Sequence, residues 1–86
     1  MELKKKSWPE MFEKVLDGTK KFDLRLADFE CKAGDTLVLQ EWDPKSKKYT
    51  GRELRKKVTY VLKTKEVKLW PQKEIKKYGF QLLSLE

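Results

Sequence analysis

The 86-residue sequence contains no histidine and only one cysteine, Cys31, and these absences exclude several kinds of chemistry. Without histidine there is no plausible zinc ligand set, no histidine-based triad and no histidine-held metal-bound water. A single cysteine excludes an internal disulfide. Cys31 lies between Glu30 and Lys32, with no base nearby in the sequence to activate its thiol, so it is not assigned as a nucleophile. The sequence therefore predicts no metal site and no cofactor.

Long apolar runs are also missing. No stretch approaches the ~20 apolar residues that a membrane-spanning helix needs. The N-terminal sequence Met-Glu-Leu-Lys-Lys-Lys leads into no apolar segment of the kind found in secretion signals. Together with the single cysteine, these absences predict a protein of the reduced cytoplasm with no membrane partner.

Positive charge is what the sequence has in excess. Lysine and arginine outnumber aspartate and glutamate by 21 to 14, which gives a net charge of +7. On so short a chain this favours an anionic partner, with RNA or DNA first and acidic membrane surfaces second. A basic surface can also serve solubility alone, so charge by itself assigns no function. The length predicts one domain over residues 1–86, near the lower end of what folds on a single core.

The clearest local prediction is a helix from about Trp8 to Asp17. Ser7 and Glu10 have the spacing of a capping box, and the proline between them suits a first helical turn. Gly18 fits the left-handed position just after a helix end. The apolar residues that share one helical face are Trp8, Met11, Phe12, Val15 and Leu16.

Several strands are expected after this helix. Period-two alternation predicts one at 22–26, a central one at 36–42 and a long one over 54–63, with a closing strand at 80–85. A second, shorter helix is expected at 71–78, and residues 3–6 form either a strand or an arm. Strands in so short a chain must protect their edges. The pattern therefore predicts a mainly β, α+β domain, a small barrel of about five strands with one or two flanking helices.

The segment from Gly18 to Arg25 joins the first helix to the first of these strands and carries the main candidate site. If the apolar residues of the strand point inward, Asp23 and Arg25 share its other face, with Lys20 and Lys21 in the preceding turn. A carboxylate beside a guanidinium and ammonium groups suits a phosphate-bearing ligand. The alternative is a strand with a solvated, charged face.

Further candidates lie elsewhere in the chain. Arg55 and Lys57 share one face of the long alternating run, where they would track a nucleic-acid backbone or protect a sheet edge from aggregation. Trp8, Trp42 or Tyr60 would stack on an unpaired base, with core packing as the alternative for each.

Six short motifs, taken in order along the chain, resemble the ASCH domain group of the PUA-like superfamily, in particular its small single-domain bacterial and phage branch. The motifs are Gly18-x-Lys20-x-x-Asp23-x-Arg25, Gly34-Asp35-x-Leu37-x-Leu39, Glu41-Trp42-Asp43, Tyr49-Thr50-Gly51-Arg52, Val58-Thr59-Tyr60-Val61-Leu62 and Gly79-Phe80-x-Leu82-Leu83-Ser84-Leu85. The resemblance implies a small β-barrel whose first helix and Gly18-to-Arg25 segment line a cleft. It also implies an RNA-binding module.

Some ASCH proteins are enzymes, among them acetylcytidine amidohydrolases and a ribonuclease. Lys20 and Arg25 match a lysine and an arginine of the amidohydrolase site, whereas Asp23 replaces its threonine and so removes the hydroxyl nucleophile. Glu66 is one candidate for the remaining catalytic glutamate. If the protein is an enzyme, Lys20 would act as base or electrostatic stabiliser and Asp23 as acid or orienting group.

The sequence thus predicts a monomeric RNA-binding module that holds RNA or a nucleotide beside the helix-to-strand junction. The expected contacts are Lys20, Lys21, Asp23, Arg25, Trp8, Trp42, Arg55 and Lys57. The alternative is a small hydrolase of a modified nucleoside or of single-stranded RNA, which the loss of the threonine argues against. A third reading is an adaptor that docks on an acidic protein partner.

Overall fold

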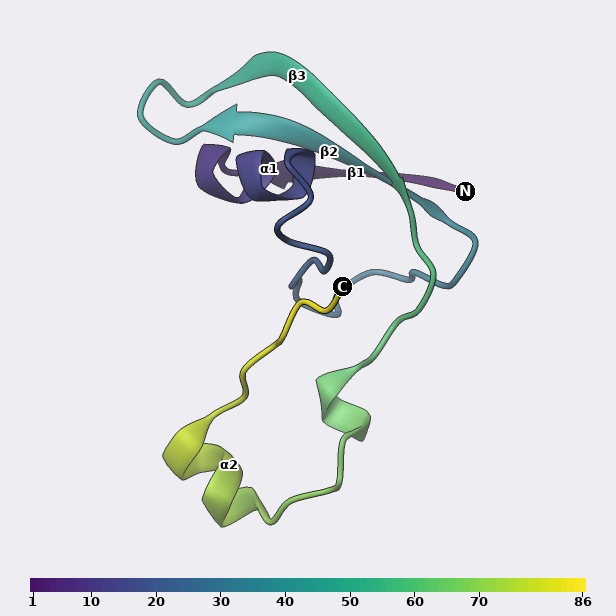
Figure 1. Ribbon diagram of the computed structural model, residues 1–86, viewed down its shortest axis with the longest axis vertical. Helices are drawn as coiled ribbons and strands as arrows, with labels where there is room; N and C mark the ends of the chain where they lie inside the picture. The colour runs from purple at the N-terminus through teal and green to yellow at the C-terminus, as the bar shows by residue number, and fades with distance from the viewer.

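A three-stranded open sheet is the centre of the fold (Figure 1). The computed structural model describes all residues, 1–86. Strands β1 (Glu2–Ser7), β2 (Thr36–Asp43) and β3 (Lys48–Lys57) lie in the order β1-β2-β3. β1 runs parallel to β2, and β3 runs antiparallel to it. The central position that two apolar faces predicted for residues 36–42 is confirmed, and residues 3–6 belong to a strand.

Helix α1 (Pro9–Leu16) covers one face of the sheet and forms the core with it (Figure 1). Phe12 and Val15 are one helical turn apart, and both pack on Leu39 of β2. The predicted helix end is confirmed, because Gly18 has φ +85° and its N–H donates to the Val15 carbonyl. The capping box is wrong. Ser7 is the last residue of β1, paired with Glu41, and the N-cap of α1 is Trp8, which makes no side-chain capping hydrogen bond.

The predicted five-stranded barrel is wrong, because the sheet has three strands and both of its edges stay open. The expected strands at 22–26 and 80–85 are irregular, and Leu24 and Leu26 are 64 % and 81 % exposed. The strand predicted over 54–63 extends only to Lys57, where β3 ends. Since no backbone ladder joins residues 58–86 to β1, nothing closes the sheet into a barrel.

The C-terminal part of the chain extends away from the sheet and returns to the segment that follows α1 (Figure 1). It contains a single 3₁₀ turn, η1 (Thr64–Glu66), and helix α2 (Gln72–Tyr78), which confirms the helix expected before Gly79. Near its end, the Lys21 N–H donates to the Ser84 hydroxyl oxygen at 2.9 Å. None of the helices is long and apolar enough to span a membrane.

Candidate functional site

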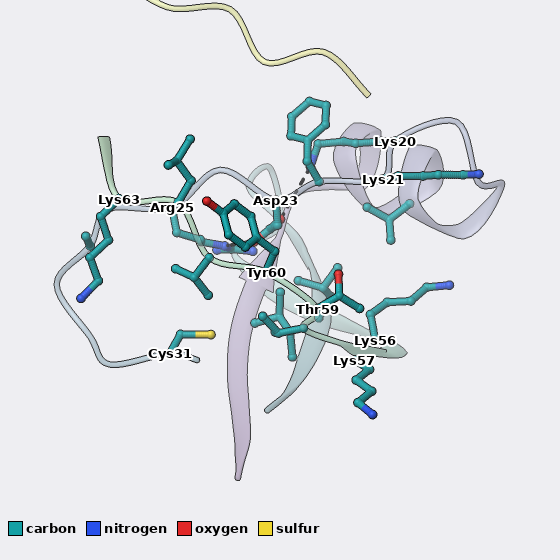
Figure 2. Close-up of a pocket in the computed structure, with 18 of the residues that line it drawn as sticks. Lys20, Lys21, Asp23, Arg25, Cys31, Lys56, Lys57, Thr59, Tyr60 and Lys63 are labelled. Carbon is teal, nitrogen blue, oxygen red and sulfur yellow. Dashed lines mark hydrogen bonds and ion pairs between the residues drawn. The ribbon is translucent and has the colours of Figure 1, made fainter. Parts of the chain in front are cut away.

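A cavity of about 510 Å³ lies between the segment that follows α1 and the segment that follows β3 (Figure 2). Its inner lining is mostly apolar, with Leu37 and Leu39 of β2 contributed by the central strand. Aromatic side chains from both of these segments also line it, namely Phe22 and Phe29 after α1 and Tyr60 after β3. The volume lies within the range of small-molecule binding sites in proteins. The cavity lies beside the Gly18-to-Arg25 segment, where the resemblance to the ASCH domain group implies a cleft.

Lys20, Asp23 and Arg25 come together in this cavity as an ion-paired trio (Figure 2). The Arg25 Nε donates to Asp23 Oδ2 at 2.6 Å, and the Lys20 ammonium lies 3.6 Å from Asp23 Oδ1. The turn that brings them together begins at Gly18, and the Lys20 N–H donates to the Lys14 carbonyl. The side chains of Lys20, Asp23 and Arg25 are only 10 %, 19 % and 27 % exposed.

The trio is more sheltered than the apolar residues that alternate with it. The sequence predicted that Leu24 and Leu26 would point inward, but both are exposed while Asp23 and Arg25 are half-buried. Charged groups can be sheltered from water when each has an ion-pair partner. Asp23 is the partner of both Lys20 and Arg25. The prediction of a strand with an apolar inner face is therefore wrong, because residues 22–26 form no strand and Phe22 and Leu26 line the cavity together with Asp23 and Arg25.

Four more lysines line the cavity, namely Lys21, Lys56, Lys57 and Lys63, and none of them makes an ion pair. With Lys20 and Arg25 they make six cations against the single carboxylate of Asp23, a net +5 of the +7 carried by the whole chain. Figure 2 shows the Lys57 and Lys63 ammonium groups at opposite margins, away from Asp23. The cavity is thus apolar inside and basic at its rim.

Lys56 and Lys63 were not among the residues singled out from the sequence. Lys56 pairs with Leu37 in register, so it extends from the same sheet face as the core. The direction of the Lys56 side chain could have been inferred from the sequence, because Lys56 lies two residues after Leu54, which packs against that core. Lys63 belongs to the alternating run predicted as a strand over 54–63, on the same face as Arg55 and Lys57. Since β3 ends at Lys57, that alternation does not set the direction of Lys63.

Three of the predicted contact residues lie outside the cavity. Trp8 is exposed at the N-cap of α1. Trp42 makes an edge-to-face contact with Tyr49 and lies beneath the Lys6 ammonium, 3.8 Å from the ring centroid. Arg55 extends from the opposite sheet face and pairs with Glu2, which lowers the pKa of that carboxyl. Of the three aromatic candidates, only Tyr60 lines the cavity.

A second polar cluster, formed around Glu41, lies outside the cavity lining and ties three elements together. The Thr50 hydroxyl donates to Glu41 Oε1 at 2.6 Å, and Arg52 donates to both Glu41 oxygens at 2.9 and 2.8 Å. Arg52 also pairs with Glu13 of α1. These bonds lower the pKa of the Glu41 carboxyl to about 2. The cluster joins α1 to β2 and β3. No role was assigned to Thr50-Gly51-Arg52 from the sequence alone.

The remaining chemistry-bearing residues form no further centre. No group of three or more histidine, cysteine, aspartate or glutamate side chains is placed to hold a metal ion. Cys31 lies in the wall of the cavity. Glu66, the candidate for a catalytic glutamate, lines a neighbouring hollow of about 380 Å³ that also touches Cys31 and Tyr60.

The fold and the site define a small, basic α+β protein in which an open sheet and two irregular segments enclose an apolar cavity with a cationic rim. The chain belongs to the DUF3850 family, a domain of unknown function, whose family model matches residues 2–73. The matched region includes every residue of the cavity lining. No curated protein and no solved structure matches the chain. Nothing in this match links the chain to the ASCH domain group, so that resemblance stays a prediction.

Proposed function

We propose that this protein binds single-stranded RNA, with an unstacked base in the cavity and the adjoining phosphates on its lysine rim. The observation that carries the proposal is the gathering of Lys21, Lys56, Lys57 and Lys63, all without acidic partners, around one cavity. Cations left unpaired can neutralise phosphates and release their counterions. A protein that used lysine only for solubility would have no need to place it around a hollow.

The interior of the cavity supports RNA that is unpaired at the point of contact. Phe22, Phe29 and Tyr60 offer flat apolar surfaces, and aromatic rings bind bases by stacking. Bases within a double helix are already stacked and cannot enter such a hollow. Tyr60 is 76 % exposed, so its ring is accessible to an incoming base.

Binding rather than hydrolysis is the activity proposed. Asp23 is the only carboxylate in the cavity lining, and both of its oxygens are engaged by Lys20 and Arg25. Such a carboxylate positions its neighbours and is poorly placed to take a proton from water or substrate. No observation favours turnover.

The test is fluorescence anisotropy with a labelled nonamer of single-stranded RNA. We expect Lys21→Ala, Lys56→Ala and Lys57→Ala together to weaken binding about tenfold or more, because three phosphate contacts are lost. The matched control changes Lys45, Lys47 and Lys48 to alanine in the hairpin turn, where an equal loss of charge lies outside the cavity. Equal weakening in both variants, or no binding by the unaltered protein, would contradict the proposal.

A further inference from the structure

We infer that the cavity prefers guanine, which Arg25 recognises by donating from its two terminal amino groups to the O6 and N7 atoms of the base. This inference rests on the proposed function and names the specificity of the same site. It assigns Arg25 to base recognition and leaves the phosphates to the lysine rim.

The orientation of Arg25 is the first step. Its Nε donates to Asp23 Oδ2 at 2.6 Å, and the other oxygen of that carboxylate lies 3.6 Å from the Lys20 ammonium. Because the guanidinium is planar, fixing Nε restricts the plane in which the two terminal amino groups lie. Asp23 is therefore a positioning residue, itself held by Lys20.

The second step is that the terminal amino groups of Arg25 are available to a ligand. Neither Nη1 nor Nη2 hydrogen-bonds to another protein group, since the only bond that the side chain makes is through Nε. No buried side-chain nitrogen or oxygen in the protein lacks a partner. The Arg25 amino groups are therefore accessible to solvent, and Arg25 is one of the residues that line the cavity. A ligand with two adjacent hydrogen-bond acceptors would match this oriented pair of donors.

The third step is the choice among the bases. Guanine presents the adjacent acceptors O6 and N7, which match the bidentate geometry of arginine, whereas the corresponding edge of adenine places an N6 donor beside N7. Cytosine presents a donor there, and uracil a single acceptor. Phe22 and Tyr60 line the same cavity and supply surfaces for stacking. On this edge guanine alone offers two adjacent acceptors to the Arg25 fork, and the guanine pair is the commonest specific contact of arginine with a base. Cytosine offers an adjacent pair, O2 and N3, only on its Watson–Crick edge, so cytidine is the base against which the preference must be tested.

A terminal phosphate is the competing ligand for such a fork. Two observations favour the base. The trio carries a net charge of only +1, because Asp23 neutralises one of its two cations. Four unpaired lysines line the same cavity and supply more positive charge for phosphates than the trio does.

The experiment compares nonamers of uridine that carry guanosine, inosine, adenosine, cytidine or 7-deazaguanosine at the central position. A cytidine oligomer that binds as tightly as the guanosine oligomer would overturn the preference for guanine. By anisotropy we expect the guanosine and inosine oligomers to bind about tenfold more tightly than the adenosine oligomer. Inosine retains O6 and N7, whereas 7-deazaguanosine lacks N7 and is expected to lose most of the advantage. This comparison needs no variant and so does not depend on a variant's folding.

The matched variants are Arg25→Lys, which keeps the charge and loses the fork, and Arg55→Lys on the opposite sheet face. Arg25→Lys is expected to bind all oligomers equally, and Arg55→Lys to keep the preference. Equal binding of every oligomer by the unaltered protein would overturn the guanine inference and leave RNA binding standing. Binding of none would remove the proposed function as well. An advantage for a 5′-phosphorylated oligouridine that disappears in Arg25→Lys would make Arg25 a phosphate ligand and also overturn the inference.

Discussion

Glu41 shows at the scale of one residue how a sheltered charge is made tolerable. Its carboxylate is 5 % exposed and accepts hydrogen bonds from Thr50 and Arg52. We expect Glu41→Gln to lower the free energy of unfolding by about 1–3 kcal/mol, because bonds to a charged acceptor are replaced by weaker ones and Arg52 loses a counterion. Urea denaturation measures the change. The exposed Glu30 makes no side-chain hydrogen bond, so Glu30→Gln is the control, and an equal loss there would contradict the expectation.

The Glu41 carboxyl also predicts how the free energy of unfolding changes at low pH. Hydrogen bonds from Arg52 and Thr50 lower its pKa in the folded protein from 4.5 to about 2. The unfolded chain therefore binds the proton first as the pH falls, so the contribution of Glu41 is complete above about pH 4.5 and is lost as the pH falls towards 2. Unfolding free energies of the unaltered protein and of Glu41→Gln, measured from pH 6 to pH 2, should converge across that window. A difference that stays constant would contradict the prediction.

Residue-scale predictions from the sequence were sound where the partners are close along the chain. Asp23 meets Lys20 three residues before it and Arg25 two residues after it, so a local turn was enough to infer the trio. Arg55 lies on the strand face expected for it, but its ion pair with Glu2, 53 residues earlier in the chain, was not predicted. The contact of Trp42 with Lys6 of β1 was not predicted either. Contacts between residues so far apart in the chain cannot be inferred from composition or from local spacing.

At the scale of elements, an irregularity in the β2–β3 pairing builds the Glu41 cluster. The register shifts between Gln40 and Trp42, so that Thr50, Gly51 and Arg52 lie opposite Glu41 alone. A bulge of this kind redirects side chains, and here both Thr50 and Arg52 reach the same carboxylate. Gly51 permits it with φ +95°.

We expect Gly51→Ala to lower the free energy of unfolding by about 1–2 kcal/mol, the cost of placing a Cβ in left-handed backbone. The added methyl would meet no atom within 4 Å, so the loss comes from the backbone alone. Asparagine tolerates this region better, and Gly51→Asn should cost less. Urea denaturation compares both with Glu53→Ala, a neighbour within the regular ladder. A loss in Gly51→Asn as large as in Gly51→Ala would contradict this account of the bulge.

The elements also show which patterns in the sequence are decisive. Helix α1 followed from its apolar spacing and from Gly18, both local signals, whereas its capping box failed because β1 runs directly into it. The strand expected at 22–26 failed because alternation over five residues supplies no neighbouring strand, and these residues pair with none. The barrel failed for a different reason. Closure needs backbone pairing between distant segments, and apolar stretches such as 80–85 do not specify a partner.

Across the whole molecule, burial and charge are unevenly distributed. The buried hydrophobic residues, Phe12, Val15, Val38 and Leu39, all belong to α1 and β2. Helix α2 buries none of its residues, and Trp70 packs edge-to-face on Phe80 within the C-terminal part itself. The cavity lies where this small core ends, so its walls combine core side chains with the loose segments on either side.

The uneven charge makes the salt dependence of RNA binding a property of the whole molecule. Each neutralised phosphate of a single strand contributes about −0.7 to the slope of log K against log salt concentration, so the four unpaired lysines predict a slope of about −3. Lys56→Ala with Lys57→Ala should reduce its magnitude by about 1.4, the share of two contacts. Changing Lys45 and Lys47 in the hairpin turn should leave it unaltered, although the net charge falls equally. Anisotropy titrations from 50 to 300 mM salt measure the slopes. Equal reductions in both variants would mean that RNA responds to the net charge of +7 rather than to its concentration around one cavity.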